Sequence, residues 1–274
     1  MTEFNKLYGQ LNKAQKEAVD TIEGPVMVVA GPGTGKTQIL TLRIANILLK
    51  TDTPPGGILA LTFTEAGAKE MKRRLREIIG PQANDVRIHT YHGFANSIIV
   101  EFDDHFPHLG RIKQITEIEA EMLVRDILKE KRFAKLRPFG EPDFYVDKII
   151  GTISDAKKEA WTPEMVRVFA TDEIKRIEKD EKSMSSRGPT KGKLRAEALK
   201  RIEKCERTIL FADVYKAYEQ SKKDQRKMDY DDLIVELLLA FRTDELLLKM
   251  IQERFLYILV DEHQDTNDSQ NVLI

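Results

Sequence analysis

The chain has 274 residues, which is long enough for one sizeable core and an elaboration of it. Charged residues make up 32% of the chain but the net charge is only -1, so any affinity for nucleic acid has to come from local patches and not from the overall field. The single cysteine, Cys205, excludes an intrachain disulfide and indicates a reducing compartment such as the cytoplasm, and no segment reaches the ~18 consecutive apolar residues of a membrane helix.

Short apolar runs alternate with helical periodicity in the first part of the chain. The runs 26–29, 58–63 and 86–90 each predict a buried strand. Between the second and third runs, apolar residues at helical spacing predict one face of a helix: Ala68, Met71, Leu75 and Ile78. Strands that alternate with helices form βαβ units, so the sequence predicts an α/β fold with a parallel sheet.

No strand-like run of comparable quality appears from about residue 107 to about residue 223. This stretch instead predicts helices over 116–130, 143–158 and 163–170, and the next strand follows at 255–260. We therefore expect a large all-α subdomain inserted into the sheet domain.

Within this stretch, two highly charged segments, 172–182 and 191–207, flank a run at 183–192 that contains Ser, Gly and Pro. Such a run predicts a loop, so we expect a helical hairpin. Its charges favour a solvated helix pair held by Glu–Lys pairs, with contact to duplex phosphates as the alternative.

A glycine-rich run, 30–37, follows the first apolar run and precedes a helical pattern. In such a strand–loop–helix arrangement, glycines let successive backbone N–H groups point at phosphate oxygens, and the helix N-terminus adds a positive dipole end. Lys36 would then bind the β- and γ-phosphates of ATP, and the Thr37 hydroxyl would bind Mg²⁺. Ala30 stands where the strict pattern has glycine, so a plain glycine-rich turn is the alternative. The expected phosphate cradle is Gly31, Gly33, Thr34, Gly35, Lys36 and Thr37.

An acidic run, 261–267, follows the apolar run 257–260. Asp261 at the end of that strand is expected to hold Mg²⁺, and Glu262 to polarise the attacking water. Gln264 is expected to sense the γ-phosphate. A polar turn that caps the next helix is the alternative, but it does not explain two acids directly after a buried strand. The catalytic candidates are therefore Glu262, Lys36 and Gln264.

The glycine-rich loop (Ala-Gly-x-Gly-Thr-Gly-Lys-Thr) and the acidic run (Asp-Glu-x-Gln-Asp-Thr-Asn) resemble motifs of the UvrD/Rep/PcrA family of superfamily 1 DNA helicases. Four more segments resemble that family in order: 11–15 its adenine-reading Q motif, 61–71 motif Ia, 90–94 motif Ib, and 228–233 the Asp-Phe-x-Asp-Leu element. The resemblance implies a P-loop NTPase (RecA-like) parallel sheet flanked by helices. It also implies an ATP-dependent helicase that moves on single-stranded DNA, 3′ to 5′, in repair or replication.

The resemblance assigns roles to residues outside the two phosphate motifs. Gln15 would read adenine, and Gln38 stands in the nucleotide site where the family often has arginine. Phe63 would stack on a base, and Thr90 and His92 would contact the backbone of the strand. Thr64, at the end of the same predicted strand as Phe63, is a further candidate for DNA binding. From the residues alone, Phe63 is as readily a core aromatic, and His92 a helix-capping residue. The implied partners are single-stranded DNA and single/double-strand junctions.

We expect residues 1–108 and 224–274 to form two segments of the first RecA-like domain, and 109–223 to form the inserted helical subdomain. The chain ends just after the acidic run, so the second RecA-like domain and the arginines that complete the ATP site are expected to lie outside it. Two alternatives remain open: a truncated nucleotide- or DNA-binding regulatory module without motor activity, and a P-loop phosphotransferase. The residues 264–267 and the motif at 61–71 speak against the phosphotransferase.

Overall fold

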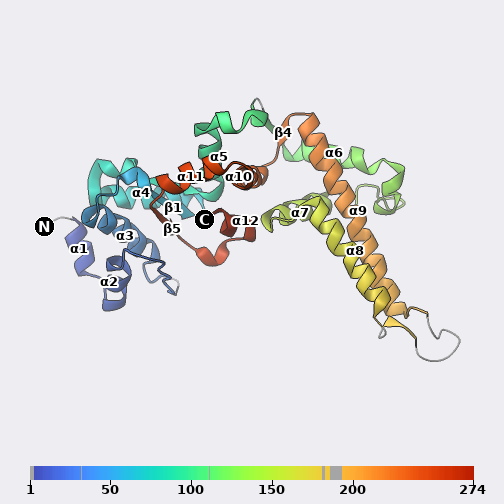
Figure 1. Ribbon diagram of the computed structural model, residues 1–274, viewed down its shortest axis with the longest axis horizontal. Coiled ribbons are helices and arrows are strands. Elements are labelled where there is room, and N and C mark those ends of the chain that lie inside the picture. Colours follow the sequence, from blue (N-terminus) through green and yellow to red (C-terminus); the bar gives the residue numbers. More distant parts are fainter. Residues whose placement is uncertain (1–2, 32, 111, 181–182, 186–192) are drawn as a thin grey trace. The chain divides into compact units, whose positions relative to one another are not determined.

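The contacts in a computed structural model divide the chain into two compact units (Figure 1). One, here called the sheet unit, comprises Met1–His108 and Glu236–Ile274. The other, here called the helical unit, comprises Leu109–Val235. The structure describes residues 3–31, 33–110, 112–180, 183–185 and 193–274.

The sheet unit is built on a three-stranded parallel sheet with the strand order β2-β1-β5. Its strands are β1 (Ile58–Thr62), β2 (Arg87–Thr90) and β5 (Tyr257–Val260). The central strand β1 is buried along its whole length, as its continuous apolar run predicts. Because the strands are parallel, the residues that follow them meet at one edge of the sheet, and the motifs predicted at 61–71, 90–94 and 261–267 all begin there.

Helices surround this sheet and supply the other half of its core. Helices α3 and α4 pack with β1 through buried residues that include Ile44, Ile47, Met71 and Leu75. The predicted apolar face of α4 is therefore confirmed. The helices of the unit are α1 (Glu3–Gly9), α2 (Lys13–Asp20), α3 (Lys36–Lys50), α4 (Glu65–Ile79), α5 (Tyr91–Glu101), α11 (Glu245–Arg254) and α12 (Asp268–Leu273), and α10 (Asp232–Thr243) begins in the helical unit.

The strand predicted at 26–29 is absent, and that prediction is wrong. These residues have no regular secondary structure, and Met27 and Val29 are 88% and 86% exposed. An apolar run becomes a strand only when a neighbouring strand accepts its backbone hydrogen bonds. Among the described residues, no strand pairs with 26–29.

The helical unit contains the helices predicted from its periodicity, with shifted ends, and one strand pair that was not predicted. Its helices are α6 (Glu117–Leu128), α7 (Val146–Lys158), α8 (Pro163–Lys179) and α9 (Ala196–Asp224). Strands β3 (Lys113–Gln114) and β4 (Lys227–Met228) form the pair, and their two-residue length explains why no apolar pattern revealed them. None of the described helices is long and apolar enough to span a bilayer.

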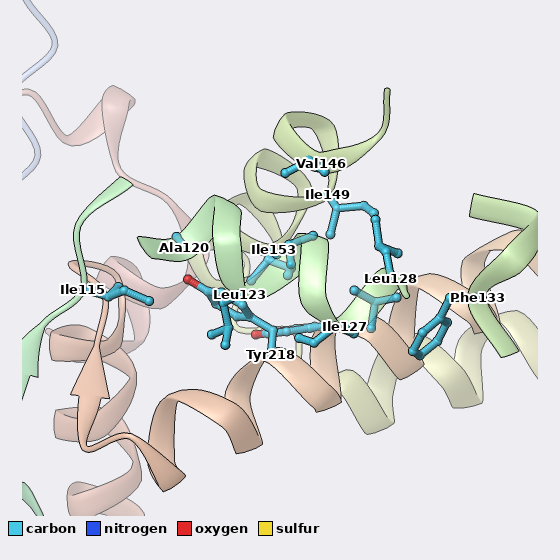
Figure 2. Close-up of a cluster of buried hydrophobic side chains, with 13 residues drawn as sticks. Ile115, Ala120, Leu123, Ile127, Leu128, Phe133, Val146, Ile149, Ile153 and Tyr218 are labelled. Atoms are coloured by element: carbon cyan, nitrogen blue, oxygen red, sulfur yellow. The ribbon is translucent and has the colours of Figure 1, made fainter. Parts of the chain in front are cut away.

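The core of the helical unit lies where α6 and α7 meet α9. Figure 2 shows Leu123 and Ile127 of α6, Ile149 and Ile153 of α7, and Tyr218 of α9 in one cluster. Helices α8 and α9 pack side by side as a hairpin, as predicted. Most of the predicted hairpin loop, at 186–192, lies outside the described residues.

Two buried lysines join the elements of the helical unit. Lys157 of α7 and Lys222 of α9 are 3% and 1% exposed, and each ammonium group donates to both Asp229 and Asp232 at 2.5–2.7 Å. Burial alone would raise the pKa of Asp229, but the charges of the two lysines outweigh it and lower that pKa to about 2. Glu219 of α9 completes the cluster at 2.9 and 3.0 Å from the two lysines. These bonds hold residues 229–232 in the helical unit, which continues past the boundary expected at 223.

Candidate functional site

The glycine-rich run forms the loop that leads into α3. Gly33 and Gly35 have positive φ values of 73° and 83°, a conformation that costs a side-chain-bearing residue free energy and costs glycine little. Within the loop, the Thr34 hydroxyl donates to the carbonyl of Gly31 at 2.7 Å. Helix α3 begins directly afterwards at Lys36, so Lys36 and Thr37 lie in its first turn, as the motif requires. Gln38 follows in the same turn.

The acidic run lies against this first turn. Lys36 Nζ is 3.2 Å from Glu262 Oε2, and the Thr37 hydroxyl donates to Asp261 Oδ2 at 3.3 Å. The two motifs are far apart in the sequence, and the fold brings them together because β5 pairs with β1 and α3 packs in the same core cluster as both strands. The structure therefore joins the predicted lysine, threonine and both acids in one site within the sheet unit.

The two acids of this site differ in their electrostatic environment. Burial, and after it the charge of Glu262, raises the pKa of Asp261, while the bond from Thr37 acts in the opposite direction. A bond from Gln264, and after it one from Lys36, lowers the pKa of Glu262. Glu262 is thus the more readily ionised of the two.

Asp261 and Thr37 fit a magnesium ion. Both present oxygen atoms, the ligand type that Mg²⁺ prefers, and these oxygens lie within a hydrogen-bond distance of each other. A cation between them would also offset the burial that disfavours the charged form of Asp261.

The turn after β5 places Glu262 and Gln264 together. Glu262 has a φ of 54°, in the left-handed region that is rare for residues other than glycine and occurs at functional sites. Gln264 Nε2 donates to the Glu262 carboxylate and, at 3.2 Å, to Asp265 Oδ2. The predicted sensor residue is thus bonded to the predicted catalytic acid.

Gln15 also reaches the phosphate loop. It forms a capping box with Asn12 at the start of α2, and its Nε2 donates to the carbonyl of Thr34 at 3.1 Å. The segment at 11–15 is therefore held directly beside the loop that it is expected to serve.

Two residues of α3 that the sequence did not single out hold the other end of α2. Arg43 donates to the carbonyls of Ala18, at 2.7 Å, and Thr21. The buried amide of Asn46 donates to the carbonyl of Val19 at 2.9 Å. A polar residue between Ala45 and Ile47 on a buried face was the available signal, because buried polar groups require partners. Together with Gln15, these bonds fix α2 on α3 at both ends.

Thr64 follows β1 and Thr90 is the last residue of the neighbouring strand β2, and each caps a helix. Thr64 accepts from the Gly67 N–H of α4, and Thr90 from the Gly93 N–H of α5, both at 3.0 Å. A Cβ on Gly67 would lie 2.8 Å from the Thr62 hydroxyl, and one on Gly93 would lie 3.0 Å from the Thr90 hydroxyl. A larger residue at position 67 would force the Thr62 hydroxyl to shift, and the fit at position 93 is tight.

Phe63 lies beside these caps with 53% of its surface exposed, so the core-aromatic alternative is wrong. His92 is half-buried in the first turn of α5, and the side-chain cap of this helix is Thr90. Glu65, which the sequence did not single out, accepts a hydrogen bond from the Thr90 hydroxyl at 2.8 Å and so joins α4 to α5. The candidate DNA residues therefore gather at the ends of β1 and β2.

Comparison with known proteins gives one consistent result. Residues 11–274 match the family model described as the UvrD/REP helicase N-terminal domain. Similar proteins include those named ATP-dependent DNA helicase PcrA from Staphylococcus epidermidis, 32% identical over 271 residues, and from Bacillus subtilis, 31% identical over 270 residues. These alignments cover 99% and 98% of this chain, but the chain spans only 32% and 31% of the two relatives. Since the match begins at the segment carrying Gln15 and runs through the acidic run, the chain belongs to the UvrD/REP helicase N-terminal domain family.

Proposed function

We propose that this chain is the N-terminal, nucleotide-hydrolysing region of an ATP-dependent DNA helicase. The observation that carries the proposal is the meeting of Lys36 and Thr37 with Asp261 and Glu262 in one site. Phosphate-binding and acidic groups in this arrangement are what phosphoryl transfer to water requires, because its catalysis depends on positioning and charge stabilisation. The printed names of the relatives, which are ATP-dependent DNA helicases, agree with it.

Each residue of the site has a distinct role in this proposal. Lys36 binds the β- and γ-phosphates, and Thr37 and Asp261 hold Mg²⁺, which neutralises charge on the phosphates. Glu262 exchanges its bond with Lys36 for one with the attacking water and accepts its proton. Gln264, bonded to Glu262, reports the presence of the γ-phosphate, and Gln15 reads adenine beside the loop.

Single-stranded DNA is the proposed substrate of the second half of the site. Phe63 offers an exposed ring on which a base stacks. Thr64, Thr90 and His92 lie at the N-termini of α4 and α5, where backbone N–H groups and helix dipoles favour phosphate. A second RecA-like domain outside this chain would supply arginines to the ATP site, and its opening and closing would drive stepping, 3′ to 5′, toward strand junctions.

Nucleotide binding by a Lys36→Ala variant tests the proposal. The substitution removes the fixed charge of the phosphate cradle, so we expect Mg-ATP binding to be abolished or strongly weakened. Titration with a labelled ATP analogue measures this effect. Lys50→Ala is the matched control, because Lys50 lies on the same helix and pairs with Asp20 on the surface. Equal affinity in the Lys36 variant and the parent would overturn the site assignment.

A further inference from the structure

The sheet unit contains a cavity of about 470 Å³ whose lining includes no residue of the phosphate loop. This volume lies within the range of small-molecule sites. Its lining includes the four successive residues 86–89. Residues 87–89 belong to β2, and successive side chains of a strand point to opposite faces, so a cavity that touches all three lies along the strand edge. Strand β2 is an end strand of the sheet.

Basic side chains from two elements line this cavity: Lys72 of α4, and Arg87 and His89 of β2. Arg87 and His89 are two residues apart and so point to the same face of the strand. Arg73 and Arg74, the neighbours of Lys72 on α4, are both paired with Glu70. Among the described residues, in contrast, no carboxylate forms an ion pair with Lys72.

Two carboxylates oppose this positive charge only in part. Glu101 lies 3.6 Å from Arg87, but its closer partner is Arg254 at 2.7 Å, so its charge is shared between two arginines. Asp85 also lines the cavity, and it is exposed to water. The cavity therefore keeps an excess of positive charge.

The positive charge of the cavity affects the pKa of His89. Burial lowers its pKa, and the charges of Arg87 and Lys72 lower it further, while Glu65 acts weakly in the opposite direction. An anion in the cavity would offset the repulsion from Arg87 and Lys72 and favour the charged, doubly donating form of the imidazole.

We propose that this cavity binds a phosphoryl group, carried either by a nucleic-acid backbone or by a free phosphate compound. Lys72 and Arg87 donate charge-assisted hydrogen bonds to its oxygens, and His89 donates a further one when protonated. The site is separate from the ATP site proposed above, and it does not depend on nucleotide binding there.

The histidine itself provides the test. The imidazole of His89 is titrated with pH by NMR, with and without inorganic pyrophosphate or a short oligothymidylate. A bound phosphate stabilises the imidazolium, so we expect each ligand that binds to raise the pKa of His89. The signals of His105 and His108, which pair with Asp244 and Glu236 and do not line the cavity, serve as internal controls. A response to pyrophosphate alone identifies a free phosphate compound as the ligand, and a response to the oligonucleotide identifies the nucleic-acid backbone.

Variants of the cavity residues test whether these residues cause the response of His89. Lys72→Ala and Arg87→Ala each raise the pKa of free His89, by removing a repelling charge, and each weakens phosphate binding about tenfold, the loss of one charge-assisted bond. Lys69→Ala, an exposed lysine of the same helix outside the cavity, changes neither quantity. In a Lys36→Ala background the response of His89 persists, which distinguishes this proposal from the ATP site. An unchanged pKa of His89 at millimolar levels of both probes overturns the proposal, as does a response that survives removal of Lys72 and Arg87 together.

Discussion

Phe63 is an aromatic residue whose side chain is exposed although it stands next to a buried strand. It follows the fully buried strand β1, yet half of its surface is exposed. Phe94 of α5, in contrast, is 3% exposed and packs edge to face on Phe255, with 5.7 Å between the ring centroids. The pair therefore allows a binding role and a packing role to be compared in one unit.

Phe63→Ala is expected to weaken binding of single-stranded DNA by ~1–3 kcal/mol, the contribution of one stacked base. The melting temperature should hardly change, because the ring packs little. Phe94→Ala should instead cost ~3–5 kcal/mol of stability, as for a buried phenylalanine. Thermal melts and fluorescence anisotropy on the full-length protein measure both effects. A collapsed melting temperature in the Phe63 variant would contradict the binding role.

At the scale of elements, the position of α2 on α3 depends on side chains that donate to its last carbonyls. Arg43 and Asn46 supply three such bonds, and Gln15 fixes the other end beside the phosphate loop. Orphan carbonyls at a helix C-terminus need donors, and here the neighbouring helix provides them. The segment expected to read adenine is thus held in place by the same helix that begins with Lys36.

Asn46→Leu is expected to destabilise the sheet unit by ~1–3 kcal/mol, because it keeps the side-chain size and leaves the Val19 carbonyl buried without its donor. Amide hydrogen exchange in α2 should become faster. Lys50→Ala removes an exposed pair with Asp20 between the same two helices and should change stability by less than ~1 kcal/mol. Equal stabilities of the two variants would show that the buried amide does not hold α2.

At the scale of the whole molecule, the proposed function makes this site one side of an ATP-hydrolysing centre. Among the described residues, Glu262 pairs with a lysine, and no arginine is bonded to Glu262 or Asp261. Arginines that act from a second domain stabilise the charge of the transition state in sites of this kind. We therefore expect this chain to bind ATP but to hydrolyse it slowly.

The rate of ATP hydrolysis by the 274-residue chain should be lower than that of a full-length relative by a factor of ~10³–10⁵, which is the usual contribution of such arginines to the rate. Steady-state phosphate release, with and without single-stranded DNA, measures the rate. A Glu262→Gln variant sets the background. Robust DNA-stimulated hydrolysis by the chain alone would mean that the completing groups already lie within it.

The parallel sheet, the helix face of α4 and the two phosphate motifs were predictable because they rest on short-range patterns. The irregular structure of residues 26–29 could not be predicted, because an apolar run does not reveal whether a neighbouring strand is available to pair with it. The Glu65–Thr90 bond and the contacts of Arg43 and Asn46 join separate elements, so only the fold brings these groups within reach. The roles proposed for the nucleotide- and DNA-binding residues remain predictions.

The buried lysine cluster of the helical unit has a consequence for how this sequence can change over time. Replacing Lys157 or Lys222 alone leaves buried carboxylates without enough positive charge. The free energy of unfolding then falls by ~3–5 kcal/mol, which is a large part of the total stability of a typical domain. Replacing Asp232 alone removes one charge-assisted hydrogen bond from each of the two ammonium groups. Exchanging the whole set for apolar residues of similar volume is close to neutral. Related chains should therefore inherit these positions as a block, with all the charges present or all of them gone.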